Sequence, residues 1–205
     1  MRVVTIARQL GAGGGEIATR LAERLGWRLL DRALVERIAE EMGAEPEQVA
    51  ACDERVETFV ERLGQYLSEG FPEVLPFPVL PPVSPELTAR AARRVVAAVA
   101  NEGPAVVVGH GAQCALQNDP RALHVLVHAP LAFRSARAVS RFGVDEREAA
   151  ERIHRSDADR RAYIREHFGR EWLDPTLYHL CVDTGRLGID AALDLVEAAT
   201  RRIFA

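Results

Sequence analysis

The chain has 205 residues, of which 48% are hydrophobic and 27% charged, and its net charge at pH 7 is −4. That length accommodates one α/β domain with a sizeable core, and the composition is ordinary for a soluble globular protein. The mildly acidic charge, without a basic tail, argues against a nucleic-acid polymer as partner. The N-terminus runs directly into a strand and no apolar run approaches the length of a membrane span, so we expect neither a signal peptide nor a membrane partner.

The cysteines indicate the redox environment of the protein. The three cysteines, Cys52, Cys114 and Cys181, are far apart in the sequence and show no CxxC spacing. An odd number of widely spaced cysteines suits a reducing compartment better than a disulfide framework. We therefore expect a cytoplasmic protein with buried thiols.

Residues 3–26, VVTIARQLGAGGGEIATRLAERLG, form the most informative stretch of the chain. A short β-branched run is followed by four glycines within five positions and then by apolar residues at helical spacing that end at Gly26. Glycines let the backbone turn sharply and approach a ligand, and the start of a helix adds unpaired N–H donors and a positive dipole end. The pattern predicts a phosphate-binding turn, and the alternative is a tight strand-to-helix turn that binds nothing.

The loop matches the Walker pattern GxxxxGK[ST] only in part. Gly13 matches the second glycine, but Arg8 stands where the first glycine would be and Gly14 stands where lysine would be. Gly15 followed by Glu16 takes the place of the hydroxyl residue. The chain contains no lysine, since all 26 basic residues are arginine, so any catalytic cation must be an arginine.

A second strand is expected at residues 27–30, with Asp31 and Arg32 at its end and a helix over about 33–42. Ligands gather at the carboxyl ends of strands in open α/β sheets, so Asp31 is placed to touch one. The alternative is that Asp31 only caps the following helix. Residues 46–69 predict one or two amphipathic helices, and the apolar, proline-rich residues 71–85 predict an interface or a flap rather than a flexible linker.

The second half of the chain continues the alternation of helices and strands. A helix over 86–101 leads into a third strand, whose loop carries His110, Gly111 and Gln113. His124 and His128 lie on one face of the fourth strand, 123–130, but no carboxylate or cysteine accompanies them, so we interpret them as structural and expect no metal site. Residues 131–169 predict an arginine-rich helical region, which is either a salt-bridged solvated face or a phosphate clamp. A fifth strand at 178–183 and a closing helix at 189–203 complete a parallel sheet covered on both sides.

Taken together, these residues resemble the cytidylate kinase-like proteins, a divergent branch of the P-loop nucleoside monophosphate kinases. The motifs that carry the resemblance are TIARQLGAGGGEIATRLAERLG, LLDRALV, VVVGHGAQCAL, HAPLAFR and SDADRRAYIREHFGREWLDPTLYHLCVDTGRLGID. The resemblance implies a P-loop NTPase-type three-layer α/β fold with a five-stranded parallel sheet in the order 2-3-1-4-5. It also implies one nucleoside monophosphate kinase-like domain over 1–205, with a core of about 1–45 and 86–205, an insert of about 46–85 and a lid of about 145–172.

The resemblance also assigns roles to positions of this sequence. Residues that would bind the ATP phosphates are Gly11, Ala12, Gly13, Gly14, Gly15 and Glu16. Residues that would face the acceptor are Asp31, Arg32, His110, Gly111 and Gln113. The catalytic cations would be Arg8, Arg155, Arg160 and Arg161, and Asp157 and Tyr163 would belong to the lid. The chain departs from the family at the missing Walker lysine, at Gly15, where a basic residue is common, and at His110, where arginine followed by aspartate is usual.

The implied activity is ATP-dependent phosphoryl transfer to a nucleoside monophosphate, with CMP or dCMP as the acceptor, ATP and Mg²⁺ as cofactors and nucleotides as partners. Such transfer requires aligned reactants and neutralised phosphate charge rather than covalent chemistry by the protein. Two alternatives remain open at this point: a catalytically silent nucleotide-binding or regulatory protein of the same fold, and a small-molecule kinase with another acceptor. The apolar proline-rich segment is compatible with a homodimer.

Overall fold

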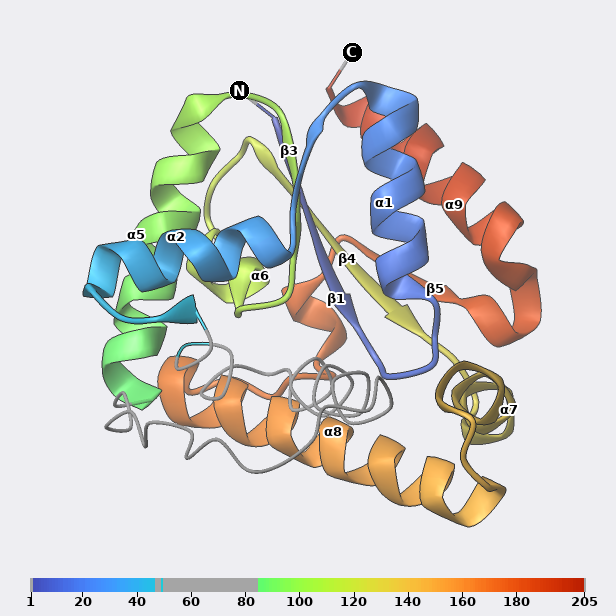
Figure 1. Cartoon of the computed structure of the whole chain (residues 1–205). Coiled ribbons are helices and arrows are strands. Elements are labelled where there is room, and N and C mark those ends of the chain that lie inside the picture. The colour runs from blue at the N-terminus through green and yellow to red at the C-terminus, as the bar shows by residue number, and fades with distance from the viewer. Residues whose placement is uncertain (1, 47–48, 50–84, 205) are drawn as a thin grey trace, which may run out of the picture.

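The computed structural model describes residues 2–46, 49 and 85–204, and every structural statement below refers to these residues. Five parallel strands form one sheet in the order β2-β3-β1-β4-β5, as Figure 1 shows. The strands are β1 (Val3–Arg8), β2 (Arg28–Leu30), β3 (Ala105–Val108), β4 (Ala122–His128) and β5 (Leu180–Asp183). The predicted fold class and strand order are therefore confirmed.

Helices cover both faces of the sheet, as expected for an all-parallel sheet. On one face lie α1 (Gly14–Leu25) and α9 (Thr184–Ile203), and on the other lie α2 (Arg32–Met42) and α5 (Pro85–Glu102), with the short α6 (Ala112–Ala115) after β3. Side chains of the central strand β1 pack against both helix layers, because successive side chains point to opposite faces of the sheet. Val3 packs with the α2 and α5 layer, whereas Val4 and Ile6 pack with the α1 and α9 layer.

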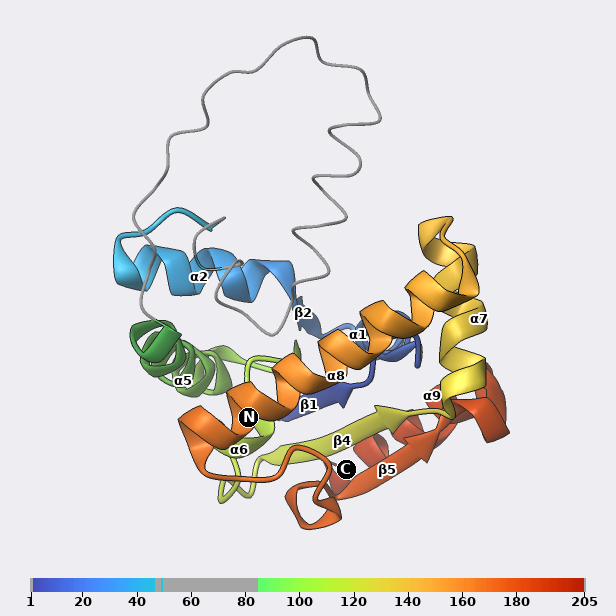
Figure 2. The same cartoon turned by 90° about the horizontal axis from the view of Figure 1, so that it is seen from below.

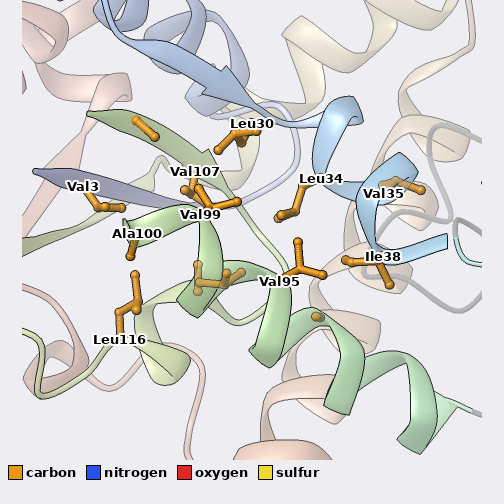
Figure 3. Close-up of a cluster of buried hydrophobic side chains, with 14 of the residues drawn as sticks. Val3, Leu30, Leu34, Val35, Ile38, Val95, Val99, Ala100, Val107 and Leu116 are labelled. Carbon is orange, nitrogen blue, oxygen red and sulfur yellow. The ribbon is translucent and has the colours of Figure 1, made fainter. Parts of the chain in front are cut away.

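The core between the sheet and the α2 and α5 layer is built from medium-sized aliphatic side chains. Figure 3 shows Leu34 and Ile38 of α2 beside Val95 and Val99 of α5, with Val107 of β3 behind them. This packing fixes α2, and with it the end of β2, against the sheet. The position of the loop after β2 is thus set by burial of apolar area, which is the main favourable term in folding.

The arginine-rich region, predicted as helical from 131 to 169, is divided into α7 (Leu131–Phe142) and α8 (Glu146–Phe168). Gly143 ends α7 in the left-handed conformation, with φ 64°. Asp145 then starts α8 by accepting the Glu148 N–H at 2.8 Å, a usual N-cap arrangement. The two views in Figures 1 and 2 show α8 lying across the carboxyl end of the sheet, where ligands of α/β proteins gather.

Two expectations near the C-terminus need correction. The fifth strand begins at Leu180 rather than at 178, because residues Pro175–Leu177 form a 3₁₀ turn, and α9 begins at Thr184, with non-helical backbone at Gly188. The expectation of buried thiols is wrong for Cys181, which is exposed on the edge strand β5, while Cys114 is half-buried.

Several predictions concern the part of the chain that the structure does not describe. The predicted helices of 46–69 and the proline-rich interface or flap of 71–85 lie almost wholly outside the described residues. The division into core, insert and lid therefore stays a prediction. None of the described helices combines the length and apolar character that crossing a membrane requires.

The buried His124 and the exposed His179 take part in a polar network between β1, β4 and the start of β5. The His124 ring accepts or donates at 2.8 Å to the Thr5 hydroxyl and at 3.2 Å to the Leu116 carbonyl, and it stacks on the His179 ring at 4.8 Å. Burial, reinforced by the charge of His179, lowers the pKa of His124 to about 4. A neutral ring fits both contacts, with Nε2–H donating to Leu116 and Nδ1 accepting from Thr5.

This network predicts acid sensitivity of the fold. Between an unfolded pKa of about 6.5 and the folded value of about 4, the unfolded chain binds a proton at His124 that the folded chain does not. The stabilisation is complete above the unfolded pKa and is lost as pH falls, by up to about 3 kcal/mol of unfolding free energy. Urea unfolding at pH 7, 5.5 and 4.5 measures the loss, and His124→Gln, which cannot titrate, should flatten it; equal pH slopes for the two proteins would contradict the assignment.

Candidate active site

The glycine loop joins the end of β1 to the start of α1 at the carboxyl end of the sheet. Gly11 and Gly13 have positive φ angles of 77° and 81°, a conformation that favours glycine. Gly13 is the N-cap residue of α1, and no side chain caps this helix. The first backbone N–H groups of α1 therefore depend on a ligand or solvent, as at the anion sites of other helix N-termini.

The loop is packed closely at three of its glycines, where an added side chain would force a neighbour to shift. A Cβ on Gly11 would lie 2.6 Å from the carbonyl oxygen of Arg134, and one on Gly13 would lie 2.2 Å from Cδ1 of Ile189. A Cβ on Gly14 would lie 2.4 Å from Cβ of Arg8. The stem of Arg8 thus occupies the space where the side chain of a Walker lysine would begin.

Two polar side chains fix the loop to its neighbours. The hydroxyl of Thr184, buried at the start of α9, donates to the carbonyl of Ala12 at 2.8 Å. The side-chain oxygen of Gln9 accepts the N–H of Ala129 at 3.3 Å. These contacts couple the loop to the ends of β4 and β5, so its shape is set by the fold rather than by a ligand alone.

Glu16 lies in the first turn of α1 and is ion-paired. Its carboxylate contacts Arg137 of α7 at 3.0 Å and Arg20, one turn further along α1, at 3.5 Å. Arg137 also lies beside Gly13, with Nη2 3.7 Å from the position of a Cβ there. The loop therefore has a cation from α7 at its edge, and the sequence alone did not single it out.

The predicted acceptor loop after β3 has unusual backbone geometry. Gly109, His110 and Gly111 have successive φ angles of 75°, 57° and 66°, and His110 is the non-glycine residue with positive φ in the described part of the chain. The ring of Phe168, at the end of α8, fills the space above Gly111. His110 and Gln113 are each only 2% exposed, and Nε2 of Gln113 has no hydrogen-bond partner among the described residues. Such strained, buried polar loops occur at functional sites.

Asp31 and Arg32 lie at the end of β2, as the sequence predicted. Asp31 occupies the N-cap position of α2, but its side chain makes no capping hydrogen bond. The alternative interpretation of Asp31 as a simple helix cap is therefore not supported. Arg32 is the first residue of α2.

The residues predicted for the lid differ in their surroundings. Arg155 and Arg161 are exposed on α8. Arg160 is only 1% exposed: it donates to the Ser156 hydroxyl at 2.5 Å, and its guanidinium lies 5.9 Å from the ring centre of Trp172. Tyr163 is buried in the same apolar cluster as Trp172. The structure thus places Arg160 and Tyr163 in the packing of α8, while their predicted roles stay predictions.

Of the two alternatives for the arginine-rich region, the first half of α8 fits the salt-bridged, solvated face. Arg147 pairs with Glu151 at 3.0 Å and Arg152 pairs with Glu148 at 2.6 Å, both at i,i+4 spacing. Exposed pairs of this kind stabilise a helix by only about 0.3–0.5 kcal/mol. These residues form a solvated face rather than a clamp.

Sequence analysis missed the buried ion pair of Arg134 and Asp157, which joins α7 to α8 at 2.8 Å. It had assigned Asp157 only to the lid and had given Arg134 no role. A usable signal did exist: Arg134 lies in HAPLAFR, one turn into the helix after the carboxyl end of β4, and this helix packs against the glycine loop.

A parallel 2-3-1-4-5 sheet with a glycine loop between its central strand and the following helix defines the three-layer fold of the P-loop kinases. Within that class, the chain belongs to the Cytidylate kinase-like family, whose sequence pattern matches residues 3–186. The predicted resemblance is thereby confirmed.

Two curated relatives are cytidylate kinases from archaea. The chain is 32% identical over 81 residues to that of Methanopyrus kandleri, a match covering 40% of this chain and 42% of the relative. It is 31% identical over 104 residues to that of Aeropyrum pernix, covering 51% and 60% respectively. The matched segments thus span about half the length of these relatives.

Similar folds occur in solved structures. An uncharacterized protein from Eubacterium ventriosum superposes with a TM-score of 0.72 at 20% identity, covering 98% of this chain and 99% of that one. A shikimate kinase from Bacteroides thetaiotaomicron superposes with a TM-score of 0.53 at 15% identity and covers 98% of both chains. At these identities the similarity shows the fold alone.

Proposed function

We propose that the chain is a phosphotransferase that moves the terminal phosphoryl group of ATP to a nucleoside monophosphate, with CMP or dCMP as the foremost acceptors. Membership of the family, the fold and the archaeal relatives support a nucleotide kinase. The family resemblance supports a pyrimidine acceptor. A cytoplasmic location and a homodimer belong to the same proposal.

The observation that carries this proposal is the contact between Arg8 and Gly14. Phosphoryl transfer needs positive charge beside the transferring oxygens. The stem of Arg8 begins beside Gly14, at the place where a Walker lysine would start. We infer that the guanidinium of Arg8 supplies the charge that the missing lysine would supply.

The loop also fits the phosphates of ATP. Its glycines leave the N-terminus of α1 open to an anion, and nothing lies within 4 Å of a Cβ built on Gly15. Glu16 is the residue between positions 11 and 16 whose side chain carries an oxygen, so it would hold magnesium together with the phosphates and water. The metal would neutralise phosphate charge.

The predicted acceptor and lid residues would reach the substrates from different elements of the fold. Asp31, Arg32, His110, Gly111 and Gln113 would contact the acceptor from the ends of β2 and β3. Arg155 and Arg161 are exposed on α8 and would contact a phosphate from there. Arg160 is buried against Trp172, so it would reach one only if this part of α8 moved.

A second candidate function is a silent nucleotide binder of the same fold. The environment of Glu16 favours it: a carboxylate in the first turn of α1 already neutralises Arg137 and Arg20. A negative charge beside a phosphate site opposes binding unless a metal ion lies between them. Loss of one charge-stabilising group also costs orders of magnitude in rate.

The deciding experiment measures ADP formation from Mg-ATP with CMP, dCMP, UMP and shikimate in parallel, with an acceptor-free control. We expect acceptor-dependent turnover with a pyrimidine monophosphate. Turnover with shikimate alone would establish a small-molecule kinase. Calorimetric binding of ATP without turnover for any acceptor would favour the silent binder.

A further inference from the structure

A buried ion pair lies in the wall of the glycine loop. Nη1 of Arg134, in the first turns of α7, lies 2.8 Å from Oδ2 of Asp157 in the middle of α8, and the two side chains are only 8% and 14% exposed. Removing two charges from water is costly unless all their hydrogen-bonding atoms are satisfied. Most ion pairs of this chain whose partners are described lie at the surface, so this pair is distinctive.

The two side chains share one hydrogen bond, although an arginine and a carboxylate can share two. Nε of Arg134 and Oδ1 of Asp157 are both buried, and neither has a hydrogen-bond partner in the part of the chain that the structure describes. An arginine and a carboxylate that served packing alone would gain from two parallel hydrogen bonds. Buried polar groups without partners are rare in proteins and call for an explanation, such as a ligand that supplies the missing bond.

The position of Arg134 indicates what that ligand is. Its carbonyl oxygen, Cα and Cβ lie 2.6, 2.9 and 3.0 Å from a Cβ built on Gly11, so its backbone touches the glycine loop. Leu10, the loop residue before Gly11, is buried between α7 and α8 with Ala138 and Ile153. Nε is the guanidinium nitrogen nearest along the side chain to this backbone.

The neighbouring arginines are engaged elsewhere. Arg137 is paired with Glu16, and Arg160 donates to Ser156 and lies beside Trp172. Arg134 differs from Arg137 because its Nε is buried without an acceptor among the described residues, while Asp157 holds its other end. Such an arrangement presents a fixed N–H and a positive charge to an anion.

We infer that Arg134 is a phosphate ligand of the glycine loop, in which Nε–H donates to an oxygen of a bound polyphosphate. Asp157 is a positioning residue that holds the guanidinium at the loop. This inference rests on the proposed function for the identity of the ligand, a nucleoside polyphosphate. It adds a residue from α7 to the loop itself and explains how the missing lysine is compensated by more than one arginine.

The test uses calorimetric titration of the full chain with Mg-ATP and, separately, with inorganic pyrophosphate, together with the melting temperature of each variant. We expect Arg134→Met to weaken binding of both probes about tenfold to a hundredfold, the range for a charged hydrogen bond. Asp157→Asn should weaken binding less, because the amide still accepts from the guanidinium. Arg147→Met is the matched control, since Arg147 is an 88% exposed arginine of the α7 and α8 region, and its Kd should equal that of the wild type.

The double variant Arg134→Met/Asp157→Leu separates binding from folding. Replacing both members of a buried pair by apolar residues is often neutral or stabilising, so its melting temperature should return toward that of the wild type. We expect its affinity for pyrophosphate and Mg-ATP to remain as weak as that of Arg134→Met. Wild-type affinity in a folded double variant would overturn the inference and leave a purely structural pair.

The outcomes also separate this inference from the proposed kinase activity. A wild type that binds Mg-ATP through Arg134 but phosphorylates no acceptor supports the inference and defeats the kinase proposal. A wild type that turns over, with Arg134→Met unchanged in Kd, defeats the inference alone. A wild type that binds neither Mg-ATP nor pyrophosphate overturns both.

Discussion

Replacing Arg8 by alanine is expected to lower kcat by about two to three orders of magnitude, the usual loss for one preorganised group that stabilises transition-state charge. The reason is that the stem of Arg8 lies where a Walker lysine would begin, and the chain has no lysine to take its place. The melting temperature should change little, because Arg8 is only partly buried at the end of β1. Steady-state ADP formation with the preferred acceptor measures the loss.

The exchange variant Arg8→Gly/Gly14→Lys provides a sharper test. It restores two positions of the Walker pattern, glycine at position 8 and lysine at position 14, while Gly15 still stands in place of the hydroxyl residue. Removing the Arg8 side chain also removes the atoms that lie 2.4 and 3.0 Å from a Cβ at position 14. We therefore expect the double variant to recover much of the activity that Arg8→Ala loses, while Gly14→Lys alone is destabilised by the clash with the Arg8 stem.

The control for both variants is Arg2→Ala, which removes an exposed arginine just before β1, at the opposite end of the strand. Its kcat should match that of the wild type. Wild-type turnover in Arg8→Ala would remove Arg8 from the proposed catalytic cations. If the exchange variant folds normally but recovers no activity, the catalytic cation of this chain acts from a different direction than a Walker lysine would.

The parallel, helix-covered sheet was predictable because it follows from local patterns, whereas the strand order 2-3-1-4-5 came from the family resemblance. Each strand is a short apolar run, and each glycine-rich or polar loop follows the carboxyl end of a strand, so chain order alone restricts the parallel topologies. The turn at Gly11 and Gly13 was predictable for the same reason, since glycines between a strand and a helix have few other uses. The break at Gly143 was missed because arginine-rich sequence surrounds it on both sides, although glycine followed by an N-cap aspartate is its signal.

The burial and the ion-pair partners of individual arginines could not be predicted from the sequence. Arg155, Arg160 and Arg161 lie within one short stretch, yet Arg160 alone is buried, because its side chain meets Trp172 from a later segment. Arg134 and Asp157 are 23 residues apart on different helices, and they meet only because α7 and α8 fold against each other. Pairings of this kind depend on tertiary packing, and a sequence pattern shows only that many cations are available.

The second prediction concerns the stability of the fold and follows from the tight contact between the glycine loop and α7. Gly11→Ala should lower the free energy of unfolding by about 2–4 kcal/mol, since it combines a left-handed backbone with overpacking. The new Cβ would lie 2.6 Å from a backbone carbonyl oxygen and 2.9 Å from a Cα, both of Arg134, and backbone atoms cannot rotate away as a side chain can. Urea unfolding at pH 7.5 measures the change.

Gly15→Ala is the matched comparison in the same loop, measured for stability alone. Gly15 lies in the first turn of α1, nothing is within 4 Å of its Cβ position, and its backbone is not left-handed. Alanine there should raise the unfolding free energy by about 0.5 kcal/mol, because it restricts the unfolded chain and favours the helix. A loss below about 1 kcal/mol for Gly11→Ala would mean that α7 separates from the loop with little resistance, in which case Arg134 could not be held rigidly at a phosphate and its contribution to binding would be small.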